Sequence, residues 1–76
     1  MRIDIKLYGD LKKYAPSGPS QFSMTVPSAT TLADIHAMLA IPGGSHISLV
    51  NGRRTEREAR LEEGDSIVLM PPIAGG

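Results

Sequence analysis

Two segments in the first third of the chain alternate polar and apolar residues. Residues 2–8 and 21–26 both show the period of two that is typical of a strand with one buried face. Their apolar members are Ile3, Ile5 and Leu7 in the first segment and Phe22, Met24 and Val26 in the second. We predict a strand in each segment, with Gly9 ending the first and Pro27 ending the second.

Helical structure is predicted at two places. Residues 10–19 contain several Pro and Gly residues, which predicts a loop with one helical turn inside it. Further on, Thr31 stands at a helix N-cap position, and Asp34 is its capping-box partner three residues later. Apolar residues follow at helical spacing: Leu32, Ile35 and Leu39, with Met38 beside them. The breaker Pro42-Gly43-Gly44 predicts that this helix ends near Ala40.

The second half of the chain predicts a hairpin and a last strand. A short apolar run at 47–50 is followed by Asn51-Gly52, a pair that favours a type I′ turn. A partner strand should therefore begin at Arg53. Residues 62–65 predict a turn, and residues 66–70 predict a strand that is apolar on both faces, as is typical of a central strand.

This order of elements predicts an α+β protein with one mixed sheet of four to five strands, covered on one face by a single helix. A chain of 76 residues is long enough for one small domain. We assign residues 1–70 to that domain and residues 71–76 to a flexible C-terminal tail.

Composition excludes several kinds of function. Eight basic residues balance eight acidic ones, so no strong basic field favours nucleic-acid binding. Without cysteine the chain has no disulfide, thiolate metal site or cysteine nucleophile. No apolar run is long enough for a signal peptide or a membrane span, so we expect a cytoplasmic protein that binds no membrane.

The most informative feature is the ending, Pro71-Pro72-Ile73-Ala74-Gly75-Gly76. A terminal Gly-Gly alone is weak evidence, because small residues are common at disordered chain ends. Here the tail follows directly from a predicted central strand, and the two prolines favour an extended exit. Two glycines without side chains could also enter a channel too narrow for other residues. The terminal carboxylate is a poor electrophile until it is activated, for example as an acyl-adenylate.

Residues 61–76, with the Gly-Asp turn, apolar strand, Pro-Pro and Gly-Gly at this spacing, resemble the C-terminus of the MoaD/ThiS family. These proteins are the sulfur carriers of molybdopterin and thiamine biosynthesis. The likeness extends to Val50-Asn51-Gly52 and to the first strand. It implies a ubiquitin-like β-grasp fold in which the first and last strands pair in parallel at the centre of the sheet.

The resemblance also implies a mechanism. A ubiquitin-activating-like enzyme adenylates the carboxylate of Gly76 with ATP, and a sulfur donor converts it to a thiocarboxylate that supplies sulfur to another enzyme. Gly75 and Ala74 accompany Gly76 into the partner's active site, and Pro71 and Pro72 set the direction of the tail. The chain would then be no enzyme and would bind no cofactor, the ATP being used by its partner.

The ending is closer to the small, non-catalytic subunit of molybdopterin synthase than to the thiamine carrier. In that subunit, apolar residues on the open sheet face help to dock the large subunit. The matching positions are Tyr8 and Met70, which the strand pattern also places away from the helix. Arg53 and Arg54 stand where the family commonly has an apolar contact. Together with Arg57 and Arg60 they form either a docking patch for an acidic partner or ordinary surface charge balanced by Glu56 and Glu58.

Several alternatives stay open. The chain could serve a thiamine-type or other sulfur pathway, it could be a ubiquitin-like modifier conjugated through Gly76, or it could be an interaction module with an inert tail. Two histidines without cysteine make a poor metal set, so no metal site is predicted, and His36 is expected on a partly exposed helix flank. Three neighbouring carboxylates are interpreted as a solvated turn, not a catalytic cluster: Glu62, Glu63 and Asp65.

Overall fold

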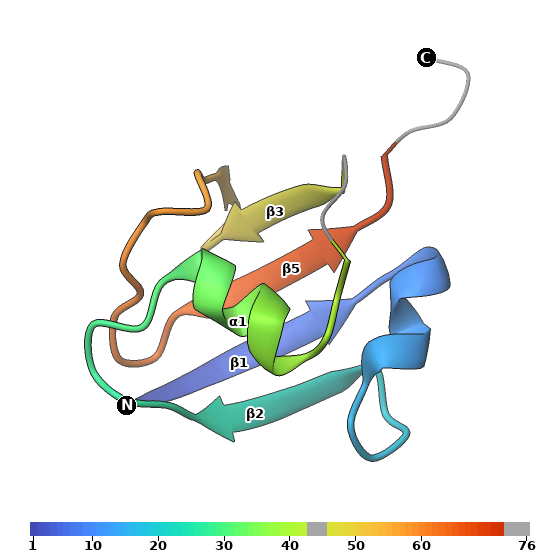
Figure 1. Ribbon diagram of the computed structural model, residues 1–76, viewed down its shortest axis with the longest axis horizontal. Helices are drawn as coiled ribbons and strands as arrows, with labels where there is room; N and C mark the ends of the chain where they lie inside the picture. The colour runs from blue at the N-terminus through green and yellow to red at the C-terminus, as the bar shows by residue number, and fades with distance from the viewer. Residues whose placement is uncertain (43–45, 73–76) are drawn as a thin grey trace.

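The computed structural model, which describes residues 1–42 and 46–72, contains a five-stranded mixed sheet with one α-helix lying across one face (Figure 1). The strand order is β2-β1-β5-β3-β4. The elements are β1 Arg2–Leu7, the 3-10 helix η1 Gly9–Tyr14, β2 Gln21–Thr25, α1 Leu32–Met38, β3 Ile47–Val50, β4 Arg53–Arg54 and β5 Ser66–Met70. The predicted α+β class and the β-grasp arrangement are confirmed.

Strand β5 is paired on both sides, which explains why its sequence is apolar on both faces. It pairs in parallel with β1, where Ile5 faces Ile67, and antiparallel with β3, where Leu49 faces Val68. The parallel pairing of the first and last strands is the one that the family resemblance implies. It puts the last strand in the middle of the sheet.

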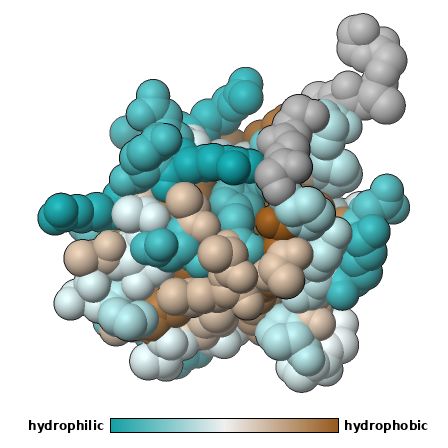
Figure 2. Space-filling model, viewed as in Figure 1, coloured by the Kyte–Doolittle hydropathy of each residue, from teal (hydrophilic) through white to brown (hydrophobic). Residues whose placement is uncertain are grey.

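The hydrophobic core lies between the sheet and α1. The fully buried side chains come from both central strands and from the helix: Ile3, Ile5, Leu7, Leu32, Ile35, Ile67 and Leu69. Alternate residues of β1 and β5 therefore face α1, as the period of two predicts. On the helix side, tan and brown atoms form a band across the middle of the view, with hydrophilic atoms around it (Figure 2). One predicted member of the apolar helix face, Met38, is 49% exposed.

The predicted capping box at the start of α1 is present. The Asp34 backbone N–H donates to the Thr31 hydroxyl at 3.2 Å, and the Thr31 N–H donates to the Asp34 carboxylate at 2.9 Å. Two further N–H groups of the first turn donate to the backbone carbonyls of Arg57 and Ala59. These bonds satisfy donors that a helix N-terminus otherwise leaves unpaired, and they bind the segment before β5 to α1.

The helix ends two residues before the predicted position. Leu39 is its C-cap, and Ala40 has a φ of 58°. Of the predicted breaker, Gly43 and Gly44 lie outside the described residues. Among the described residues, no helix has the length and apolar character needed to cross a bilayer.

The Asn51-Gly52 turn joins β3 to β4 as predicted. Both residues have a positive φ, 53° and 83°, as a type I′ turn requires. The Asn51 side chain also donates to the Asp65 carboxylate at 2.9 Å and accepts from the Ser66 N–H at 3.0 Å. This turn is therefore tied to the start of β5, at the end of that strand opposite the tail.

Candidate functional site

The candidate site begins where β5 ends and the C-terminal tail leaves the sheet. Met70, the last residue of β5, faces Ile47 of β3. On the other side of β5, the Tyr8 N–H donates to the Leu69 carbonyl at 3.0 Å. The strand is therefore held from both sides up to its last two residues. Pro71 follows at once and is partly buried, whereas Pro72 is exposed.

Three of the predicted site residues, Ala74, Gly75 and Gly76, lie outside the described residues. Pro72 is the last described residue, and it stands four positions before the end of the chain. Four extended residues span at most about 13 Å. Gly76 therefore lies within a short distance of the end of β5.

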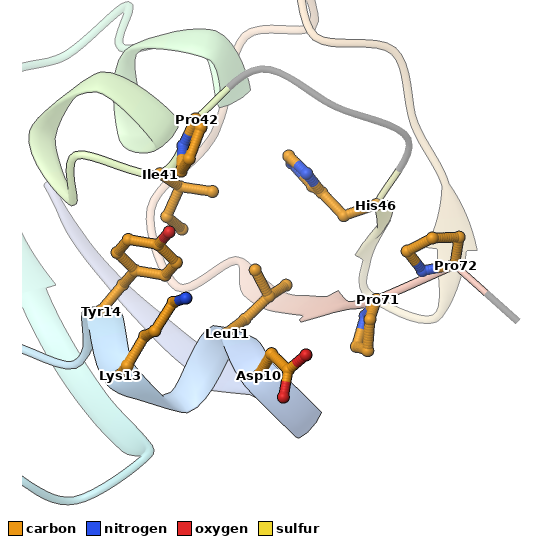
Figure 3. A pocket seen from close by; sticks show the side chains of 9 residues that line it. All are labelled: Asp10, Leu11, Lys13, Tyr14, Ile41, Pro42, His46, Pro71 and Pro72. Atoms are coloured by element: carbon orange, nitrogen blue, oxygen red, sulfur yellow. The ribbon is translucent and has the colours of Figure 1, made fainter. Parts of the chain in front are cut away.

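A cavity of about 190 Å³ lies beside Pro71 and Pro72, which we call the tail root. It is formed by η1, by the chain after α1 and by the two prolines, and Figure 3 shows Leu11, Lys13 and Tyr14 rising from η1 towards it. The complete lining is Asp10, Leu11, Lys13, Tyr14, Ile41, Pro42, His46, Pro71 and Pro72. Its walls are mainly apolar, with one carboxylate and one ammonium group among them.

The expectation that His36 lies on a partly exposed flank is wrong. The side chain is only 5% exposed, and its Nε2 lies 2.7 Å from Nε2 of His46. Among the described residues, the other ring nitrogen, Nδ1, has no hydrogen-bond partner. Helical periodicity could not predict this burial, because the side chain that lies against His36 belongs to His46, the residue before β3.

The surroundings of both histidines favour the neutral ring. Burial lowers the pKa of His36 to about 4, with further lowering by His46 and Arg57, while the backbone of Leu32 acts in the opposite direction. Burial and then Arg57 also lower the pKa of His46. Neutral imidazoles can share one N–H···N bond, so the pair fastens His46 to α1. The described residues contain no group of three or more potential metal ligands.

The open sheet face carries the predicted partner-binding residues Tyr8 and Met70. Tyr8 is 38% exposed and continues β1 in an extended conformation, and Met70 is partly exposed. The Lys6 ammonium lies 5.0 Å from the centre of the Tyr8 ring. Other partly exposed apolar side chains share this face through the strand register: Ile47, Leu49 and Val68. The face is thus a mixed apolar and basic surface that adjoins the tail root.

The two arginines of β4 cannot both belong to this face. Arg54 pairs with Leu49, whereas Arg53 pairs with Val50, which packs against the core. Successive strand residues point to opposite faces. Arg54 therefore lies on the same face as Tyr8 and Met70, and Arg53 lies on the other.

The three carboxylates of the 62–65 turn do not converge on one point. Asp65 accepts from the Glu62 N–H at 2.8 Å and from the Asn51 side chain, whereas Glu63 accepts from the Arg2 N–H at 3.1 Å. These contacts have a structural role at the end of β5 remote from the tail. They agree with the prediction of a turn.

The cavity beside the tail was not predicted from the sequence. Its walls combine residues near positions 11, 41, 46 and 71, which are far apart along the chain. The only local signals are the partial helical spacing of Leu11 and Tyr14 and the two prolines. Neither signal says that these segments meet.

The fold and the tail that leaves its central strand define a ubiquitin-like protein of the β-grasp class. The chain belongs to the ThiS family, whose model matches residues 5–76. A comparison with curated proteins gives no match.

Solved structures support the same fold. The chain is similar to SAMP1 from Haloferax volcanii, at 22% identity and a TM-score of 0.78, with both chains covered completely. It is similar to a putative molybdopterin converting factor subunit 1 from Pyrococcus furiosus, at 16% identity and a TM-score of 0.79, covering 96% of this chain and 99% of that one. The chain is also similar to a chain in a complex of subunits 1 and 2 of the molybdopterin-converting factor from Helicobacter pylori. The identity is 22% and the TM-score 0.67, with 100% of this chain and 100% of the matched chain covered.

Proposed function

We propose that this protein is a sulfur carrier that works through Gly76. The observation that carries the proposal is the segment that leads from the central strand to Gly75-Gly76. The family match extends to residue 76, and the central strand β5 leads directly into Pro71-Pro72, four residues before that end. A fixed strand followed by a short, slender tail is suited to presenting a carboxylate inside a partner's active site.

The chemistry requires three steps, all carried out with partners. An oxygen of the Gly76 carboxylate attacks the α-phosphorus of ATP, which releases pyrophosphate and leaves an acyl-adenylate on the carrier. The terminal sulfur of a persulfide donor then attacks the acyl carbon, and AMP leaves. A thiol cleaves the resulting acyl disulfide, which yields the thiocarboxylate and a disulfide. With no cysteine in the chain, the sulfur must come from outside.

We propose that the pathway to which this carrier supplies sulfur is molybdopterin biosynthesis. The Pro-Pro-Ile-Ala-Gly-Gly ending resembles that of the molybdopterin carriers, and two structural neighbours are described as subunits of molybdopterin-converting factors. One of these is seen in complex with its second subunit. The present chain would then be the non-catalytic small subunit of a cytoplasmic synthase and would insert its thiocarboxylate into a large subunit.

The open sheet face would dock these partners. Tyr8 and Met70 supply partly exposed apolar area next to the tail root, and Arg54 lies on the same face at the far edge of the sheet. Interfaces are commonly built from aromatic and methionine side chains with arginine around them. Docking on this face would fix the body of the carrier while the tail enters the active site.

ATP–pyrophosphate exchange tests the first step. The full-length chain, added to an adenylating enzyme from the same source, should stimulate the exchange of labelled pyrophosphate into ATP. A chain that lacks Gly76 should give the background rate, although its circular dichroism spectrum and unfolding midpoint match those of the full chain. Equal exchange with both chains would contradict a role for Gly76.

A ubiquitin-like modifier is the second candidate, because a lysine amine could attack the same adenylated Gly76. It predicts a ladder of larger conjugates on a blot of the tagged chain, and loss of that ladder without Gly76. A thiamine-type carrier predicts the same thiocarboxylate with a different acceptor enzyme. Sulfur transfer to a purified synthase large subunit distinguishes the two pathways.

A further inference from the structure

We infer that Gly9 is a positioning residue for the C-terminal tail: because it has no Cβ, the Pro71 ring packs directly against its backbone, and this contact sets the direction in which the chain leaves β5. The geometric part of the inference is independent of the proposed function. Only its consequence for activation rests on that function.

The contact between Gly9 and Pro71 leaves no room for a side chain. A Cβ on Gly9 would lie 2.8 Å from Cγ and 3.2 Å from Cδ of the Pro71 ring. Gly9 also has a φ of 58°, a left-handed conformation that glycine adopts without strain. Two independent requirements, backbone conformation and close approach, therefore coincide at the residue beside the tail root.

If a methyl group were added at Gly9, Pro71 would have to move. A change of ring pucker can shift Cγ, but Cδ is bonded to the Pro71 backbone nitrogen and can move little without the backbone. Gly9 itself follows a tethered residue, because the N–H of Tyr8 is bonded to Leu69. Just beyond Gly9, Leu11 is 8% exposed and its N–H donates to the Tyr8 carbonyl. Pro71 lies just past the last paired residue of β5, so the displacement should pass into the tail.

A small rotation at Pro71 is amplified along the residues that follow. If the six residues from Pro71 to Gly76 are extended inside a partner's channel, they span about 20 Å, so a slight change of direction at Pro71 moves Gly76 by a larger distance. An active site that must hold two reacting groups in line is sensitive to displacements of about 1 Å. Gly9 would thus affect activation without touching the partner.

The chain offers a matched control in Gly64. This residue also has a positive φ, 82°, but nothing lies within 4 Å of a Cβ built on it, and it stands at the end of β5 opposite the tail. Gly64→Ala carries a comparable backbone strain with no effect on Pro71. Any effect of Gly9→Ala beyond that of Gly64→Ala therefore reports the contact with the proline ring.

Paramagnetic relaxation measures the direction of the tail without any partner. Since the chain has no cysteine, Met38→Cys, at an exposed position on α1, provides a single site for a spin label. Gly9→Ala should change the relaxation rates of the tail amides, while those of β5 stay as in the unsubstituted chain. Gly64→Ala should leave the tail rates unchanged. Unchanged tail rates in Gly9→Ala would overturn the inference.

A double substitution tests whether the effect passes through the ring. Pro71→Ala removes Cγ and Cδ, and residue 71 still precedes Pro72, which favours an extended conformation there. In this background, adding Gly9→Ala should no longer change the tail relaxation rates. If Gly9→Ala shifts the tail equally with and without the Pro71 ring, the contact is not the cause.

The adenylation reaction then measures the consequence. Gly9→Ala should lower kcat/KM for pyrophosphate exchange roughly 10- to 100-fold through kcat, with the carrier's affinity for the enzyme unchanged. Gly64→Ala should retain normal kinetics. If the unsubstituted chain is not adenylated at all, the proposed function fails, while the relaxation data still decide the geometric inference. A normal kcat with a displaced tail would overturn the consequence for activation.

Discussion

The buried histidine pair shows how single side chains outside the tail contribute to this fold. His36 is buried beside His46, and its pKa is lowered to about 4 mainly by burial. An imidazole in an unfolded chain has a pKa near 6.5. Folding therefore favours the neutral ring, and protonation opposes folding.

This pair makes stability depend on pH in a defined window. Between pH 6.5 and about 4 the unfolded chain binds more protons at His36 than the folded chain does. The free energy of unfolding should be highest above pH 6.5 and should fall as the pH is lowered towards 4. The free energy of unfolding falls by about 1.4 kcal/mol for each pKa unit that separates His36 in the unfolded chain from His36 in the folded chain. Urea unfolding at pH 7, 6, 5 and 4.5 measures it.

The matched variant is His36→Leu, which keeps an apolar side chain at this buried position and removes the titrating group. Its free energy of unfolding should depend less on pH over the same window. Direct titration of the ring by NMR should give a pKa well below 6.5 for His36. A normal pKa for His36, or an equal pH dependence in His36→Leu, would contradict this account.

Among the strands and helices, β5 has the greatest structural weight, because it completes the core and carries the tail. Leu69 is fully buried in the core, whereas Val68 is partly exposed on the open face. Leu69→Ala should lower the free energy of unfolding by about 2–5 kcal/mol. Val68→Ala, one residue earlier on the same strand, should cost clearly less. Urea unfolding compares the two, and equal losses would mean that the faces of β5 are assigned wrongly.

Local sequence signals predicted the elements well, because their causes are local. The Thr31–Asp34 capping box and the Asn51-Gly52 turn depend on residues a few positions apart, and both are present as predicted. The alternation in β1 and β2 likewise identified the buried faces. The parallel pairing of β1 with β5 joins opposite ends of the chain, and only the family resemblance implied it.

Contacts between distant segments account for what the sequence did not predict. His36 is covered by a residue ten positions away, and the cavity beside the tail combines four separate segments. The close approach of Gly9 to Pro71 spans most of the chain. In each case the residue types are ordinary, and only the folded topology brings them together.

The whole molecule presents one sheet face to solvent next to the tail root. Substitutions of the two arginines of β4 test whether that face docks partners. Arg54 lies on the open face and Arg53 on the opposite one. Arg54→Glu should weaken binding to the adenylating enzyme about 10-fold, since a charge reversal at an interface removes an attraction and adds a repulsion. Arg53→Glu changes the net charge equally but should have a much smaller effect. Calorimetric titration measures both affinities.

Equal weakening by the two substitutions would indicate only a long-range charge effect. No weakening by Arg54→Glu would remove the arginine from the docking face. In either case, the affinities of Tyr8→Ala and Met70→Ala for the adenylating enzyme still test the apolar part of the open sheet face.

The most direct measurement of the central claim is thiol-selective alkylation of the chain after incubation with ATP, an adenylating partner and a sulfur source. Mass alone is insufficient, because exchanging oxygen for sulfur adds nearly the same mass as oxidising one of the four methionines. With no cysteine present, an alkylating reagent has no other thiol on this chain. The account predicts one label, mapped to the peptide that ends in Gly76 and absent when ATP is omitted. No label, with a folded chain and an active control carrier in the same assay, would contradict it.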